Sequence, residues 1–180
     1  MTTRKVLRMG NPKLREKSRP LALEEIRSES TQTLIQDLFE TMHHEQGIGI
    51  AAPQIGENVQ LCLVGLPKDD PQEGESEFDI LVVINPKIEV VDETRQQFWE
   101  GCLSVPGLRG LVPRPQKIRV AFQDQEAQSH ELELENFLAT VFQHEIDHLF
   151  GTLYVDRIED RTKLAFNEEF AQYWEEAEET

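Results

Sequence analysis

The segment His144–His148, with the sequence HEIDH, constrains the fold of this 180-residue chain more than any other feature. Histidines four residues apart on a helix point to the same side, so both imidazoles can reach one metal ion. On a strand the two rings would not converge in this way. A candidate N-cap at Asn136 and a stop at Gly151 favour a helix. Glu145 could then lean towards a metal-bound water without ligating the metal. The alternative interpretation of the motif is that the two histidines only pack against neighbours or cap the end of the helix.

A catalytic metal site usually takes three protein ligands and leaves one position open. Cys102 lies in a polar, glycine-flanked segment, Trp99–Gly107, where apolar packing does not explain a cysteine. We therefore expect Cys102 to be a ligand, whereas Cys62, which lies between two leucines, is expected to be a small core residue. Glu168 or Glu169 would supply the third ligand instead if the chain were an HExxH-type zinc endopeptidase.

The remaining hydrophobic pattern predicts an α+β fold, with mainly antiparallel sheets packed around the histidine-bearing helix. An N-terminal amphipathic helix is expected from Ser30 to Gln46, a final helix from Asp160, and extended segments at 59–64, 80–84, 87–91, 94–99, 118–122 and 132–134. Leu103–Gln116 contains three prolines and two glycines, which argues against regular structure. The acidic segment 68–77 is expected to be a solvated insertion loop.

Charge is unevenly distributed along what we expect to be a single catalytic domain, 1–180. Residues 1–20 form a basic, irregular head with seven bases and one acid, and residues 160–180 are expected to form an acidic helix. The formal charge of −16 argues against a broad nucleic-acid-binding face, so no DNA partner is expected.

The longest aliphatic run is far below the ~20 residues of a membrane span, and no secretory signal is recognisable. The expected location is therefore the cytoplasm, away from membranes.

Three segments resemble, in the same order, the signatures of one protein family. They are G-x-G-x-A-A-x-Q at Gly47–Gln54, E-G-C-L-S at Glu100–Ser104 and Q-H-E-x-D-H at Gln143–His148. The opening Val6–Arg15 is also similar, and the resemblance extends over about residues 5–158. The chain thus resembles the peptide deformylases, and the joint occurrence of three motifs is far more specific than any one of them. The resemblance implies removal of the N-formyl group from the initiator methionine of new polypeptides, with release of formate.

The resemblance also implies one metal ion per chain, held by Cys102, His144 and His148, with water as the fourth ligand. Ferrous iron is the implied native ion, and Ni²⁺, Co²⁺ or Zn²⁺ would substitute for it. The ligand types by themselves indicate only a tetrahedral sulfur and nitrogen site suited to zinc or iron. Iron is therefore the contribution of the family.

A mechanism follows from these residue types and from the resemblance. A metal ion lowers the pKa of a bound water, and Glu145 could take the proton as general base and later pass it to the departing amine. Negative charge then develops on the formyl oxygen, which requires donors fixed in advance. The side-chain amide of Gln54 suits this role, and the family suggests the backbone N–H of Leu103 as the second donor.

Further residues are expected to bind substrate. Gly47 and Gly49 would let the substrate backbone approach and pair as an added strand. The positions that match the lining of the family's methionine pocket are Ile48, Arg109, Phe137 and Val141, although Ile48, Phe137 and Val141 could equally be core residues. Glu100 is counted with this set; together with Asp147 and Arg114 it could also orient the metal ligands, the alternative being surface ion pairs. His43, His44 and His130 are expected to be surface residues.

The implied partners are N-formyl-methionyl peptides and nascent chains. The basic head could make a transient contact with the ribosome, whereas the acidic C-terminus would be repelled by ribosomal RNA. Two other functions compete with the deformylase: the endopeptidase named above, in which Cys102 would be incidental, and a non-enzymatic metal-binding module with four protein ligands and no open position.

Overall fold

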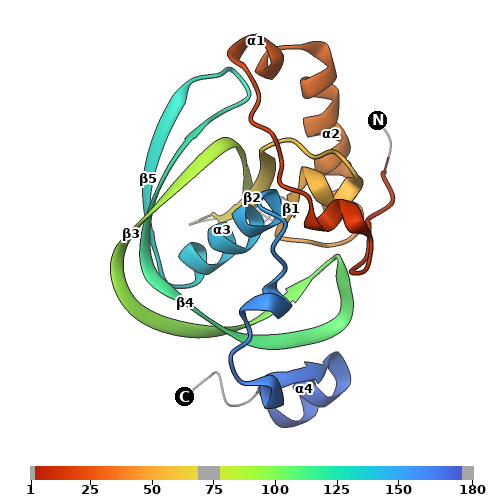
Figure 1. The fold of residues 1–180 in the computed structure, drawn as a ribbon, viewed down its shortest axis with the longest axis vertical. Helices are drawn as coiled ribbons and strands as arrows, with labels where there is room; N and C mark the ends of the chain where they lie inside the picture. The colour runs from red at the N-terminus through yellow and green to blue at the C-terminus, as the bar shows by residue number, and fades with distance from the viewer. Residues whose placement is uncertain (1–2, 69–77, 176–180) are drawn as a thin grey trace.

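The fold is a six-stranded antiparallel sheet curved around one helix, as the computed structural model shows for residues 3–68 and 78–175 (Figure 1). The strands are β1 (Gly49–Ala51), β2 (Leu61–Pro67), β3 (Phe78–Cys102), β4 (Val105–Gln123), β5 (Ser129–Glu135) and β6 (Leu164–Phe166). They pair in the order β1-β2-β3-β4-β5, with β6 on β4. The helices are α1 (Leu23–Ile26), α2 (Glu29–His44), α3 (Asn136–Leu149) and α4 (Asn167–Tyr173). The expected α+β class with mainly antiparallel pairing is confirmed.

Four short 3₁₀ turns join these elements: η1 (Pro12–Arg15), η2 (Ala52–Ile55), η3 (Tyr154–Arg157) and η4 (Arg161–Lys163). Helix α3 lies inside the curve of β3, β4 and β5, while α1 and α2 cover the other end of the sheet (Figure 1). One core cluster, which includes Phe142, Ile146 and Leu149, fills the space between α3 and the sheet. A second, which includes Leu38 and Met42, joins α2 to β1 and β2. The histidine-bearing helix is therefore central, as expected.

Strand β3 merges three extended segments that the sequence suggested were separate, 80–84, 87–91 and 94–99. Its pairing with β4 shifts register at several points, one of them around Asn85, which has a φ of +51°. Bulges of this kind add twist and bend a strand without ending it. They let a strand of 25 residues curve around α3.

The expectation of irregular structure at Leu103–Gln116 is wrong, because Val105–Gln123 forms β4. Between residues 111 and 116 only β3 pairs with this strand, because β6 pairs only with residues 108–110 and β5 only with residues 117–123. Prolines are tolerated on such an unpaired edge. The free carbonyl of Pro115 there accepts a hydrogen bond from the side-chain amide of Gln143 on α3, at 3.0 Å.

Two helix starts differ from expectation. The N-cap of α2 lies two residues before the expected one, because Ser28 rather than Ser30 accepts the backbone N–H of Thr31. Asn136 has a φ of +57° and its side chain accepts from Gln116 instead of capping α3. The expected stop at Gly151 is confirmed: its φ is +75°, and an added Cβ would lie 2.5 Å from the carbonyl oxygen of Arg15.

The single acidic helix expected over 160–180 is not formed within the described residues. Asp160 caps only the short turn η4. The three residues after η4 form β6 and pair with Leu108–Gly110 of β4. Helix α4 then starts at Asn167. The helical spacing of Phe166 and Phe170 had suggested one continuous helix. In the structure Phe170 is buried, whereas Phe166 is 63% exposed and lies in β6. Most of the expected insertion loop at 68–77 and the last five residues, 176–180, lie outside the described residues.

Candidate metal centre

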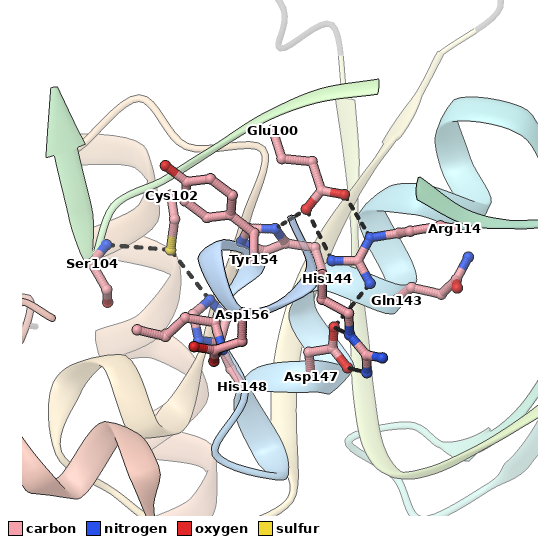
Figure 2. A network of polar contacts seen from close by, with 12 residues as sticks. Glu100, Cys102, Ser104, Arg114, Gln143, His144, Asp147, His148, Tyr154 and Asp156 are labelled. Carbon is pink, nitrogen blue, oxygen red and sulfur yellow. Dashed lines mark hydrogen bonds and ion pairs between the residues drawn. The ribbon is translucent and has the colours of Figure 1, made fainter. Parts of the chain in front are cut away.

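Cys102, His144 and His148 converge at the end of β3 and on the buried side of α3. Their ligand atoms lie within 4.8 Å of one another, and Cys102 Sγ is 3.3 Å from His148 Nε2 (Figure 2). The imidazole centroids are 5.1 Å apart. The turn between β3 and β4 brings the cysteine to the helix, so residues 42 and 46 positions apart in sequence meet in one place.

The three side chains fit a tetrahedral metal ion. Bond lengths of about 2.3 Å to sulfur and 2.1 Å to nitrogen place two tetrahedral ligand atoms roughly 3.6 Å apart, close to the sulfur–nitrogen distance found. Burial, together with the nearby charges of His144 and Arg114, lowers the pKa of His148, so its imidazole is neutral as a ligand must be. A thiolate with two imidazoles is a donor set typical of zinc or iron.

Glu100 fixes the orientation of His144. Its carboxylate lies 2.7 Å from His144 Nδ1, which leaves Nε2 to face Cys102 and His148. Arg114 donates to both oxygens of Glu100, at 2.5 and 2.9 Å, and to Asp147 at 2.9 Å (Figure 2). Glu100 and Arg114 are buried, so they are not a surface ion pair.

The charges of this group are mutually stabilised. Burial opposes ionisation of Glu100, but hydrogen bonds from Arg114 and His144 outweigh it and hold the pKa of Glu100 below its usual range. Burial likewise opposes protonation of His144, yet in the metal-free site its contacts with Cys102 and Glu100 raise the pKa of His144. A metal ion bound to His144 would have to displace the proton from its Nε2. Asp147 also accepts two hydrogen bonds from Arg157, at 2.6 and 3.0 Å. The result is a chain of ion pairs behind the first histidine.

Glu145 is different, because its carboxylate is almost entirely buried and incompletely paired. Its Oε2 atom has no hydrogen-bond partner among the described residues. Burial raises the pKa of Glu145 to about 7. Gly49 of β1 makes room for this side chain, since an added Cβ would lie only 2.5 Å from Glu145 Oε1. A buried carboxyl that titrates near neutrality is typical of a proton-transfer residue.

Gln54 and Leu103 both lie next to Cys102. The Gln54 side chain is buried; its Oε1 accepts from the backbone N–H of Ala51 at 2.8 Å. Its Nε2 lies 3.1 Å from Ser104 Oγ and 3.6 Å from Cys102 Sγ. The Gln54 amide hydrogens therefore point into the centre. Leu103 follows the cysteine directly in the turn between β3 and β4.

The expected substrate-binding residues are spread around the centre. Val141 is buried in the core cluster under α3, whereas Ile48 is 38% and Phe137 47% exposed. Gly47 precedes β1, an outer strand of the sheet, and Arg109 lies on β4 directly opposite Gly101. The exposure of Ile48 and Phe137 disfavours a core role for them.

Sequence reasoning did not find Tyr154. Its ring stacks on His144 with centroids 6.0 Å apart, and its hydroxyl donates to the carbonyl of Leu108 at 3.1 Å. No sequence motif identifies this tyrosine, because both contacts depend on how η3 packs against β4 and α3. The other assignments are confirmed: Cys62 is fully buried in the core, and His43, His44 and His130 are exposed.

The polypeptide deformylase family model matches residues 3–164. This chain belongs to the deformylase family. It is 45% identical to peptide deformylase of Leptospira biflexa over 170 residues, 94% of this chain and 95% of that protein. It is also 45% identical to peptide deformylase 1 of Bordetella pertussis over 163 residues, 91% of this chain and 92% of that protein.

Solved structures agree with this assignment. A class I type b peptide deformylase from Acinetobacter baumannii, solved with Met-Ala-Ser bound, superposes with a TM-score of 0.79 at 31% identity, covering 87% of this chain and 99% of that one. Peptide deformylase from Thermotoga maritima gives a TM-score of 0.77 at 33% identity, covering 89% of this chain and 100% of that one. This deformylase is a metal-dependent hydrolase, and the endopeptidase alternative is not supported. No described helix is long and apolar enough to cross a membrane.

Proposed function

We propose that this deformylase hydrolyses the N-formyl group of polypeptides that begin with formyl-methionine, releasing formate and a free amino terminus. One observation carries the proposal: a buried carboxyl with an unpaired oxygen, Glu145, lies beside a cysteine and two histidines that fit a metal ion. An ion held there has three protein ligands, which leaves one position open for chemistry. A module with four protein ligands would need another donor, and the described residues group only three.

The ion is proposed to be ferrous iron, with nickel, cobalt or zinc able to replace it. Cys102, His144 and His148 would hold it through Sγ and two ring nitrogens. When bound, such an ion supplies a Lewis acid that polarises the formyl carbonyl and lowers the pKa of water. Glu100, Arg114 and Asp147 would act indirectly, by fixing the ring of His144.

Glu145 would move the proton. Its carboxylate takes a proton from the attacking water and later gives it to the leaving amine nitrogen. A pKa near 7 suits both steps at neutral pH. Gln54 Nε2 and the backbone N–H of Leu103 would donate to the formyl oxygen as negative charge develops on it. Because Gln54 is already fixed through its Oε1 atom, little reorganisation is required.

The peptide would bind along β1. This strand pairs with β2 on one side only, so its other edge can take an extended peptide as an added strand. Gly47, Ile48 and Gly49 would form that edge, while Phe137 and Val141 on α3 would contact the methionine side chain. Arg109 lies on β4, away from α3 and β1, and would contact the peptide beyond the methionine side chain.

Formate release from formyl-Met-Ala-Ser tests the proposal directly. Iron-loaded protein kept from air should release formate from this peptide and leave the acetylated analogue uncleaved. The acetyl compound differs by one methyl group, so it controls for non-specific amide hydrolysis. If the iron-loaded protein yields no formate, the proposed function is wrong.

The proposed setting is the cytoplasm, where new polypeptides are made and Cys102 stays reduced. Contact with the ribosome would be transient and would not depend on the acidic C-terminus. In support, Phe170 of α4 is buried against the enzyme itself. We expect no stable co-sedimentation with ribosomes at moderate salt; stable co-sedimentation that is lost when Glu168 and Glu169 are substituted would contradict this.

A further inference from the structure

The C-terminal segment β6–α4 packs against β4, although the family model ends at residue 164. Strand β6 extends the sheet next to Arg109, whose cross-strand neighbour on β6 is Ala165. On β3 the neighbour of Arg109 is Gly101, the residue before the Cys102 ligand. Strand β6 therefore lies beside the part of β4 that contains Arg109.

Arg109 lies in a cradle made by small residues and one aromatic ring. Both its cross-strand neighbours, Gly101 and Ala165, are small; an added Cβ on Gly101 would lie 3.9 Å from Arg109 Cγ and 4.0 Å from Cζ. The guanidinium carbon lies 5.1 Å from the ring centroid of Phe170 on α4. This is within the range of a cation–π interaction.

The ring of Phe170 is itself firmly held. It is 5% exposed and packs against Trp99 of β3, with centroids 5.0 Å apart. Trp99 also contacts Trp174, at 5.7 Å between centroids, and Lys163 lies 3.7 Å above the Trp174 ring. A cluster of tilted aromatic rings that includes Trp99 of β3 therefore lies beside the Arg109 guanidinium.

Arg109 has no carboxylate within ion-pair distance among the described residues, in a chain with 34 acidic and 18 basic side chains. Its N–H groups are therefore available for substrate, and the contact with Phe170 favours side-chain positions that keep the guanidinium beside the ring. A guanidinium offers five N–H donors, and a pre-organised one loses less entropy when it binds a peptide oxygen.

We propose that Phe170 is a positioning residue for peptide binding: it holds Arg109 so that the guanidinium binds a main-chain carbonyl beyond the first residue of the substrate. The proposal rests on the proposed function of the metal centre. It predicts that α4 changes affinity for the peptide rather than the hydrolytic step, because Phe170 touches neither the metal ligands nor Glu145 in any described contact.

The test compares Phe170→Leu with Phe170→Tyr and with Tyr173→Leu, an aromatic-to-leucine control at an exposed position of the same helix. For formyl-Met-Ala-Ser, Phe170→Leu should raise KM about two- to fivefold, the range of an exposed cation–π contact, with kcat within twofold. For N-formyl-methionine amide, which ends after the first residue, KM should not change. Phe170→Tyr keeps the ring and should restore KM, and Tyr173→Leu should leave it unchanged.

Two further measurements separate positioning from folding. In an Arg109→Gln background, Phe170→Leu should cause no additional rise in KM. In wild-type protein the side-chain NMR signals of Arg109 should show a ring-current shift that Phe170→Leu removes and Phe170→Tyr retains. Equal KM changes for both substrates, additive effects in the double variant, or an unchanged NMR signal would overturn the proposal. An inactive wild-type enzyme would instead refute the proposed function.

Discussion

Two groups of buried polar side chains meet on helix α3, and they differ in how fully they are paired. Behind His144, the carboxylates of Glu100 and Asp147 are matched by Arg114 and Arg157 through short hydrogen bonds. On the other side, Glu145 is buried with one oxygen unpaired. The paired group fixes the orientation of His144, whereas the unpaired oxygen leaves the carboxyl of Glu145 available for proton transfer.

This difference indicates where the fold is stabilised and where it carries an energetic cost. An unpaired buried polar atom costs about 1–3 kcal/mol, so native proteins keep few of them. The cost at Glu145 is consistent with a functional role, because a paired carboxylate would have a lower pKa and would be a poorer proton carrier.

The largest effect is expected for Cys102→Ala. Removing the thiolate leaves two imidazoles, so the variant should bind no stable iron and release no formate. Metal content per chain and formate release check this. Cys62→Ala is the matched control, because that cysteine lies in the core and should leave the metal content unchanged. Retention of both metal and activity in Cys102→Ala would show that this residue is not a ligand.

Glu145→Gln should separate chemistry from structure. The metal content should persist, and the melting temperature should stay the same or rise, because a neutral amide is cheaper to bury than an unpaired carboxyl. Formate release should fall about 10²- to 10⁴-fold, the usual contribution of a general base. A variant that turns over at close to the wild-type rate would refute the proton-transfer role.

Gly49→Ala should displace the carboxyl of Glu145 while leaving the glutamate itself in place. The new Cβ would overlap Glu145 Oε1, so the carboxyl must move. A displacement of about 1 Å in a reacting group costs about 10²-fold in rate. Formate release should fall by that order while metal content and circular dichroism remain normal. Wild-type kcat in this variant would mean that Glu145 has more freedom than the packing indicates.

The smallest effect on turnover is expected for Glu100→Gln, in the paired group. Loss of the charge on the His144 partner should weaken metal affinity about 10- to 100-fold, measured by competition with a chelator. When metal is saturating, kcat should change little. A large loss of kcat at full metal occupancy would instead place Glu100 in contact with substrate.

The same variant should alter acid stability. Because the pKa of Glu100 in the folded protein is below its usual 4.5, the stability from its ionised form is present above that value. That stability is lost as the pH falls through the folded-state pKa. Urea unfolding of metal-free protein should therefore show a shallower decline below about pH 4.5 in Glu100→Gln than in wild type. Identical acid limbs would show that Glu100 is not charged in the folded state.

Local sequence patterns were enough to predict the helix around His144–His148, the ligand role of Cys102 and the core position of Cys62. These depend on helical periodicity and on side-chain chemistry, which are local properties. The family signatures added Gln54 and Leu103, because motif spacing records contacts that local patterns do not.

The contacts between groups far apart in sequence became known only from the folded chain. The bending of β3, the prolines within β4 and the break before α4 all depend on which strands lie alongside, so no local window contains them. Tyr154 reaches His144, and Phe170 reaches Arg109, for the same reason. Long-range pairing fixes these contacts, and the energy that selects it comes from burying the whole sheet against α3 rather than from any one segment.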